Sequence, residues 1–179
     1  VWTETTQSGG GGGGGGDGTW SLLYDVQLAA AADRLTGQSS WQPYSTTYTV
    51  ASGSLSVGTM IRATACIEVV GVNSTDDIGV WLWGDGITAA LYQSATPVAS
   101  ESQCAQATWT ITATGASGHA YGGGWGAGQS STYSEMCRAK DGTADTTDGF
   151  LVEVKSDHTM PSTSNITDLR LLYVEVLQP

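Results

Sequence analysis

The sequence is poor in charge, and especially poor in positive charge. Charged residues make up 13% of the chain, with 6 Lys and Arg against 17 Asp and Glu, and the net charge is -11. That share is about half of the usual value of roughly 25%. Nucleic-acid binding needs a basic surface, and anionic membranes would repel this chain. We therefore expect no nucleic-acid partner and no membrane partner, and we interpret the acidity as a contribution to solubility.

Long apolar runs and helical periodicity are also missing. No run of about 18 apolar residues is present, so no membrane-spanning helix is expected. No signal peptide is visible. No segment of helical length repeats apolar residues with a period of about 3.6. The 4 prolines leave most predicted strands unbroken, and Pro97 and Pro161 fall in predicted loops.

Histidine is scarce, which limits the catalytic chemistry available. His119 and His158 are the 2 histidines, and His158 is expected in a polar loop. No Gly-x-Ser-x-Gly motif surrounds a serine, so nucleophilic catalysis is not expected. Glycoside hydrolysis needs two carboxylates across a cleft. Glu68, Glu153 and Glu175 lie on predicted strands, where solvated strand faces account for them. We predict that the chain is not an enzyme and needs no cofactor.

The 3 cysteines are Cys66, Cys104 and Cys137. An odd number leaves at least one free thiol or an intermolecular bridge. No Cys-x-x-Cys pair is present, so a zinc site is not expected. The first interpretation is that all of them are unpaired thiols, and a Cys104–Cys137 disulfide is the alternative.

Strand-like alternation dominates what the sequence does contain. It is clearest from Gly58 to Val70, where one predicted face carries Ile61, Ala63, Ala65, Ile67 and Val69, and the other carries Arg62, Thr64, Cys66 and Glu68. From Ile78 to Trp83, Val80 and Leu82 alternate with Trp81 and Trp83, and Asp85-Gly86 then predicts a tight hairpin.

Further strands are predicted at 20–28, 46–51, 87–92, 108–114, 133–139, 150–154 and 169–177. Loops are expected at 93–106 and 141–149, and Ala29–Ala32 could form one helical turn. Turn signals recur about every 8–12 residues, which is typical of antiparallel sandwiches and barrels. We predict an all-β, antiparallel, jelly-roll-like β-sandwich over residues 19–179.

The first 18 residues differ from the rest and are predicted to form an extended arm. Gly9 to Gly16 is an unbroken glycine run, and free glycine tracts are flexible coils that are costly to order. We expect neighbouring copies to hold the arm. A coil lying along its own domain and a bundled threefold polyglycine helix are the alternatives. The candidate assembly contacts are Val1, Trp2, Gly9, Gly16 and Trp20.

Three segments resemble a known family. Thr47–Ala65 (TYTVASGSLSVGTMIRATA), Trp109–Gly118 (WTITATGASG) and Leu169–Leu177 (LRLLYVEVL) resemble the jelly-roll domains of tailed-phage virion proteins. Those domains serve as head fibres, capsid decoration proteins and tail-fibre domains. The resemblance covers residues 45–179 and implies a homotrimer, a virion-surface location and no catalysis. The polyglycine arm is not a feature of that family.

Aromatic residues and an acidic segment supply the candidate binding sites. Tyr121 and Trp125 lie among glycines, and Trp81 and Trp83 form a second group. Aromatic rings can stack on sugars, but they also build cores and subunit interfaces, so both interpretations stay open. Oxygen-rich loops can bind calcium, although the spacing here does not match a calcium-binding loop. The weak calcium candidates are Asp141, Asp145 and Asp148.

The resemblance and the arm lead to three functional hypotheses. The first is a capsid decoration or head-fibre protein that binds the phage capsid surface as a trimer through its sandwich and arm. Its partners would be other copies of the chain and the major capsid protein or another virion protein. The second is a glycan- or host-recognition domain of a tail fibre. The third is the subunit of an extracellular filament, with Val1 exposed by leader cleavage.

Overall fold

The computed structural model is an antiparallel β-sandwich, as predicted from the sequence. It describes residues 18–37, 40–73, 76–95, 97–128, 133–135, 137–158 and 162–179. The arm residues Val1, Trp2, Gly9 and Gly16 lie outside the described residues. None of the helices in these ranges is long and apolar enough to cross a membrane.

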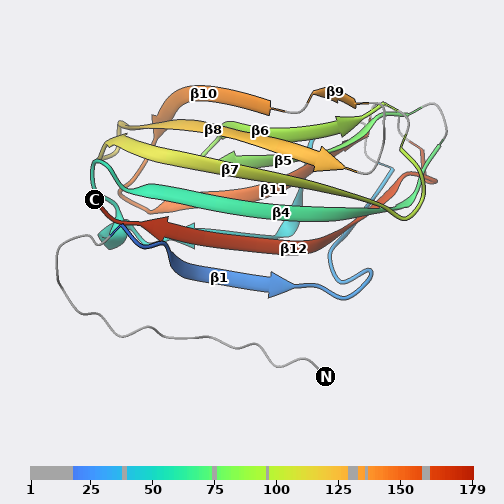
Figure 1. Cartoon of the computed structure of the whole chain (residues 1–179), viewed down its shortest axis with the longest axis horizontal. Coiled ribbons are helices and arrows are strands. Elements are labelled where there is room, and N and C mark those ends of the chain that lie inside the picture. Colours follow the sequence, from blue (N-terminus) through green and yellow to red (C-terminus); the bar gives the residue numbers. More distant parts are fainter. Residues whose placement is uncertain are drawn as a thin grey trace.

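The larger sheet has seven strands and places the first and last strands of the domain side by side. Its order is β1-β12-β4-β7-β8-β10, and β2 also pairs with β12. Ser21 lies opposite Val176, so the domain begins and ends at the same end of the sandwich (Figure 1). The strands are β1 (Ser21–Gln27), β2 (Arg34–Thr36), β4 (Met60–Gly71), β7 (Glu101–Ala113), β8 (Gly118–Gly128), β10 (Cys137–Ala144) and β12 (Ile166–Leu177).

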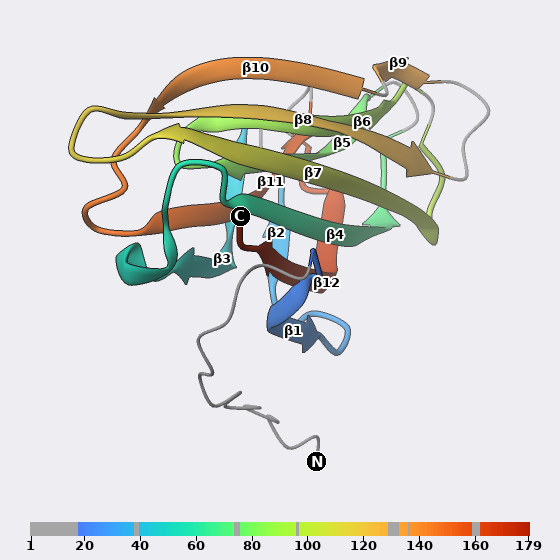
Figure 2. The same cartoon turned by 60° about the vertical axis from the view of Figure 1, so that its left-hand side comes forward.

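The smaller sheet has five strands and packs against the larger one as a second layer (Figure 2). Its order is β3-β11-β5-β6-β9. The predicted hairpin joins β5 to β6, with Asp85 and Gly86 both at positive φ, as such tight turns require. The strands are β3 (Gln42–Val50), β5 (Ile78–Gly84), β6 (Ile87–Ser94), β9 (Tyr133–Glu135) and β11 (Phe150–His158), and η1 (Ser52–Ser54) is a short 3-10 turn.

The core between the sheets follows from strand alternation. The apolar face predicted for β4 is fully buried, and Val80 and Leu82 of β5 also enter the core. Trp109 packs against Phe150 with ring centroids 5.7 Å apart and donates its indole N–H to the Ile87 carbonyl. Each buried apolar side chain stabilises the fold by about 1.5–3 kcal/mol.

Strand β8 is the element that the sequence did not predict. Gly122 and Gly124 face the core, where an added Cβ would lie 2.7 Å from the Trp109 indole nitrogen or from the Ala90 methyl group, respectively. These glycines let the two sheets approach closely at β6. A glycine-rich segment is typical of a loop, because glycine weakens a strand. In β8, however, the packing of the two sheets requires glycine at the positions that face the core.

Several expected boundaries were also wrong. Ala29–Ala32 is not helical, since Ala31 has φ of 62° in a turn held by a hydrogen bond from the Ala31 N–H to Asp168. The loop expected at 93–106 ends early, because β7 already begins at Glu101. The acidic loop expected from Asp141 is shorter than predicted, since β10 continues to Ala144.

The cysteine predictions were wrong. Cys66 and Cys104 form a disulfide, which rules out both a Cys104–Cys137 bridge and three unpaired thiols. The bridge joins adjacent strands β4 and β7, where the two cysteines lie directly opposite each other. No local pattern in the sequence indicates this register, because it depends on how two distant strands pair.

Candidate functional site

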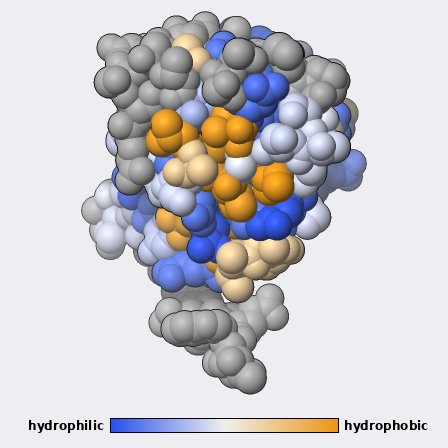
Figure 3. Space-filling model, turned by 90° about the vertical axis from the view of Figure 1, so that its right-hand side faces the viewer, coloured by the Kyte–Doolittle hydropathy of each residue, from blue (hydrophilic) through white to orange (hydrophobic). Residues whose placement is uncertain are grey.

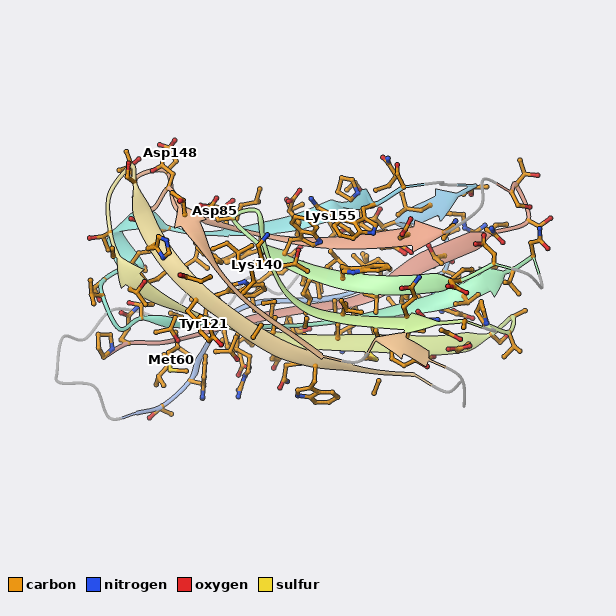
Figure 4. All side chains as sticks on the ribbon, turned by 90° about the horizontal axis from the view of Figure 1, so that it is seen from above. Met60, Asp85, Tyr121, Lys140, Asp148 and Lys155 are labelled. Atoms are coloured by element: carbon orange, nitrogen blue, oxygen red, sulfur yellow. A yellow bond between two sulfur atoms is a disulfide. The ribbon has the colours of Figure 1, made fainter. Side chains whose placement is uncertain are left out.

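The most exposed aromatic side chains of the described residues lie on one strand. Tyr121 and Trp125 of β8 are 52% and 54% exposed. Alternate residues of a strand point to opposite faces. Because Gly122 and Gly124 face the core, Tyr121, Gly123 and Trp125 all face outward from the seven-stranded sheet. We call these three residues the β8 platform. Figure 4 shows Tyr121 on the same side of the sandwich as Met60 and opposite Lys155.

Polar side chains flank the β8 platform on both neighbouring strands. On β7, Thr110 lies opposite Tyr121, Thr108 opposite Gly123 and Gln106 opposite Trp125. Opposite residues of an antiparallel pair share a face, so these side chains border the platform. Gln106 donates its Nε2 to the Thr64 hydroxyl at 3.0 Å, which fixes its carboxamide along the sheet.

The β10 side of the platform carries a histidine–aspartate pair. Asp141 lies opposite Tyr121, and its Oδ1 is 2.8 Å from His119 Nδ1. Both side chains are well exposed, at 63% for Asp141 and 41% for His119. Ala139 lies opposite Gly123, so the middle of the platform has only a methyl group at that border.

The second predicted aromatic group, Trp81 and Trp83, lies on the other face of the molecule. Trp81 is only 2% exposed and Trp83 is half-buried. The Trp81 ring lies over Gly79, where an added Cβ would be 2.7 Å away. Trp41 packs against both rings, with centroids 5.5 Å from Trp81 and 5.1 Å from Trp83. Trp81 is therefore packed under another side chain and is not available to stack on a sugar.

Charged groups complete this packed cluster on the five-stranded sheet. The Lys155 ammonium lies 4.1 Å from the centre of the Trp83 ring and 3.3 Å from Glu153 Oε2. Burial raises the pKa of Asp157, and a hydrogen bond from Trp41 opposes that rise. The cluster holds its own cation over the Trp83 ring, which fits a structural role, although the indole N–H groups of Trp81 and Trp83 are buried without a hydrogen-bond partner among the described residues.

The glutamates predicted to lie on solvated strand faces form ion pairs there. Glu175 pairs with Arg62 at 2.8 Å, and Glu68 pairs with Arg170 at 3.0 Å. The Arg62 guanidinium also lies 4.2 Å from the centre of the Trp20 ring. Trp20, the described member of the predicted arm contacts, is thus held against its own domain.

Buried polar residues gather at the end of the sandwich where β12 begins. Asp168 accepts hydrogen bonds from Arg34 Nε at 2.6 Å, from Arg34 Nη2 at 2.8 Å and from the Ala31 N–H at 2.8 Å. The hydrogen bond from Arg34 is the main cause that lowers the pKa of Asp168. Asp33 accepts hydrogen bonds from the backbone N–H groups of Ser45 and Thr46. These carboxylates fix the loop between β1 and β3.

His158 has fewer hydrogen-bond partners than the other buried polar residues at this end of the sandwich. It was expected in a polar loop, but it ends β11 and is fully buried, and neither ring nitrogen has a hydrogen-bond partner. Burial lowers its pKa. Nearby, Asn165 donates to Asp76 and accepts from the Asn73 N–H. His158 is therefore held as a neutral imidazole inside the sandwich.

Two of the three weak calcium candidates have partners in the protein. Asp141 pairs with His119, and Asp145 accepts hydrogen bonds from the N–H and hydroxyl of Thr147. Within the described part of the chain, no three acidic, histidine or cysteine side chains are grouped to hold a metal ion. The structure gives no support to calcium binding by Asp141, Asp145 and Asp148.

An apolar area lies at the end of the sandwich where β4 ends. Val70 and Val98 are 36% and 59% exposed there, and Figure 3 shows hydrophobic side chains gathered on this end among polar ones. The Ser100 N–H binds the Val69 carbonyl and fixes the β6–β7 loop against β4. Nothing in the described residues indicates what would cover this area.

The described geometry defines a β-sandwich with an open aromatic platform on one sheet. No protein-family model matches the chain, and no curated protein is similar to it in sequence. Among solved structures it is similar to lectin I-B4 from Griffonia simplicifolia in its metal-free form, with 7% identity, a TM-score of 0.34, and coverage of 90% of this chain and 94% of that chain.

A second similar structure is the CBM2 module of the evolved Dit of Lactobacillus casei BL23 phage J-1. It has 10% identity and a TM-score of 0.32, over 92% of this chain and 82% of that chain. A third is a GH43 glycoside hydrolase, with 11% identity and a TM-score of 0.37, of which the match covers 36%. These likenesses are too remote to carry an argument about function. The expectation that the chain is not an enzyme stays a prediction.

The sequence named Tyr121 and Trp125 but missed what surrounds them. Trp41 carries no pattern that links it to Trp81, since the contact depends on the fold. The bordering residues Thr108 and Gln106 alternate with apolar residues in the sequence. That alternation predicts that both side chains face outward, but it does not predict which residues of β8 lie beside them.

Proposed function

We propose that this domain binds carbohydrate through the β8 platform. The observation that carries the proposal is the pair of exposed rings, Tyr121 and Trp125, on one outward strand face. Large exposed aromatic side chains on a surface are typical of binding sites. A sugar offers an apolar face of C–H groups to an aromatic ring and hydroxyl groups to the polar residues around it.

The borders of the platform provide the matching polar groups. Thr110 and Thr108 supply hydroxyl groups along β7, and His119 and Asp141 supply a donor and an acceptor along β10. A site made of rings, hydroxyls and one histidine–aspartate contact is suited to a polar, largely uncharged ligand. A protein interface of the usual kind would instead have an apolar centre of several packed side chains.

The disulfide supports an extracellular location. Cys66–Cys104 is a structural bridge, and such bridges persist in oxidising surroundings such as secreted proteins and virion surfaces. Combined with the resemblance to phage jelly-roll domains, this favours a host-recognition domain of a phage tail fibre. A trimeric capsid decoration protein that binds the major capsid protein remains a prediction of the resemblance alone, because the arm expected to make those contacts lies outside the described residues.

Binding to immobilised, uncharged polysaccharides tests the proposal. The panel would contain glucans, galactans, mannans and bacterial cell-wall polysaccharide, with the dissociation constant measured for each. Tyr121→Ala and Trp125→Ala should each weaken binding about fivefold or more, because a stacked ring contributes roughly 1 kcal/mol or more. Leu22→Ala is the control, since Leu22 is a 46% exposed apolar side chain on β1, at the far edge of the same sheet from β8. Binding that is absent throughout the panel, or equal in all variants, would overturn the proposal.

A further inference from the structure

Glycine at position 123 stands out from the other glycines of β8. An added Cβ at Gly122, Gly124 or Gly126 would meet atoms of the core at 2.8 Å or closer, so packing requires those glycines. At Gly123 an added Cβ would meet only the Ala139 methyl group at 3.8 Å, an ordinary contact, and its φ is not in the left-handed region. The fold therefore does not require glycine at this position.

Glycine is also an unfavourable choice for a strand when packing does not require it. It loses more conformational freedom on folding than other residues, and β-branched residues are preferred at solvated strand positions. Thr108, directly opposite on β7, is such a β-branched residue. The absence of a side chain at Gly123 therefore lowers the stability of the fold, and no packing contact among the described residues compensates for it.

The position of Gly123 explains what the missing side chain provides. Residues four apart on a strand are separated by roughly 13 Å along its axis, so Tyr121 and Trp125 stand at the two ends of a low floor. That separation is wider than one pyranose ring. Gly123 forms the floor between them, with Ala139 and Thr108 at its sides. A side chain at position 123 would stand up between the two rings.

We propose that the β8 platform binds an extended, uncharged polysaccharide through internal sugars, and that Gly123 is a specificity-determining residue which keeps the path between Tyr121 and Trp125 open. The inference rests on the proposed function. The chain would run along β8, with one sugar on each ring and the sugars between them passing over Gly123. A small ligand such as a single sugar would contact one ring only.

The charge of the protein supports an uncharged ligand. The chain carries a net charge of -11, which disfavours acidic polysaccharides at long range. The titratable side chains that border the platform on the β10 side are His119 and Asp141, whose Nδ1 and Oδ1 atoms lie 2.8 Å apart. The platform itself therefore offers no unpaired cation to a carboxylate or sulfate group.

The first experiment compares Gly123→Val with the wild type on the polysaccharide of the panel that binds best. We expect Gly123→Val to keep or slightly raise the melting temperature and to weaken polysaccharide binding about fivefold or more, as the loss of one stacked sugar would. Gln27→Val is the matched control, because Gln27 is exposed on the outward face of β1 at the far edge of the same sheet. It should bind like the wild type.

The second experiment measures competition by oligosaccharides of that polymer, from the monosaccharide to the hexasaccharide. Affinity should rise with length until both rings are occupied and should not depend on the free chain end. If Tyr121→Ala and Trp125→Ala lose binding but Gly123→Val does not, or if the monosaccharide competes as well as the hexasaccharide, this inference fails and the proposed function stands. If neither ring matters, the proposed function fails as well.

Discussion

Cys66 and Cys104 lie directly opposite each other on β4 and β7 and form a disulfide on the outward side of the seven-stranded sheet. Their Cα atoms are 4.1 Å apart, which is close to the spacing of a non-hydrogen-bonded antiparallel pair. The bridge joins strands whose pairing is already extensive. It therefore ties together the middle of the sheet that carries the β8 platform.

Loss of the disulfide should destabilise the domain. The cysteines are 38 residues apart, so the bridge restricts a sizeable loop of the unfolded chain. Replacing both Cys66 and Cys104 by Ser should lower the free energy of unfolding by about 2–4 kcal/mol in urea titrations. Cys137→Ser is the control and should keep its sensitivity to reductant. A Cys137→Ser protein that reductant no longer affects would place Cys137 in the bridge.

Adjacent glycines of β8 should respond in opposite ways to the same substitution. At Gly124 a Cβ would be 2.7 Å from the Ala90 methyl group and would also press on the Gln106 carbonyl oxygen. Gly124→Val should therefore lower the free energy of unfolding by about 1–3 kcal/mol or more. Gly123→Val should not lower it. Equal melting temperatures for the two variants would contradict the close approach of β8 to β6.

The buried His158 should make stability depend on pH near neutrality. Burial lowers its folded pKa below the unfolded value of 6.5. Above that value both states are neutral and the full stability is present. As the pH falls below 6.5, His158 becomes protonated in the unfolded chain but stays neutral in the folded chain. The free energy of unfolding therefore decreases until the folded pKa is reached, by at most about 1.4 kcal/mol per pH unit.

Chemical denaturation at several pH values between about 8 and 5 measures this effect. His158→Leu should lose the His-dependent part of the slope, while His119→Gln, on the exposed face, should retain it. A His158→Leu protein whose stability declines with acid as steeply as the wild type would show that His158 is not the responsible group.

Asp168 should contribute stability that is lost in acid. Arg34 lowers its folded pKa below the ordinary value of 3.8, so its contribution is present above that value and disappears as the pH falls through the folded pKa. Asp168→Asn should lower the free energy of unfolding at pH 7 by about 2 kcal/mol, since hydrogen bonds to a charged group are lost. The difference from the wild type should shrink as the pH falls below 3.8 and through the folded pKa. Asp25→Asn, on exposed β1, should show neither effect.

The sequence predicted the fold where alternation is strong. Strand β4 and the hairpin of β5 and β6 follow directly from side chains with a period of two and from a turn that needs positive φ. It missed β8, because glycine favours no face and gives no alternation to read. The strand predicted from the sequence at 150–154 is also shorter than β11, which continues to His158, a polar residue that is buried in the fold.

For the candidate site, the sequence identified the rings but not their availability. Trp81 and Trp125 are the same residue type, each on a strand, yet one is 2% exposed and the other 54%. The difference arises from Trp41, which covers Trp81 and comes from a distant part of the chain. Exposure depends on which segments cross a face, and that is a property of topology.

By itself the sequence determined the secondary-structure class, the faces of the strongest strands and the residues able to contact a sugar, since these depend on local alternation and side-chain chemistry. Only the tertiary structure decided that Cys66 meets Cys104 and that Gly123, unlike Gly122 and Gly124, is free of packing demands. These relationships depend on the register between distant strands and on the spacing of the two sheets, which no local pattern encodes.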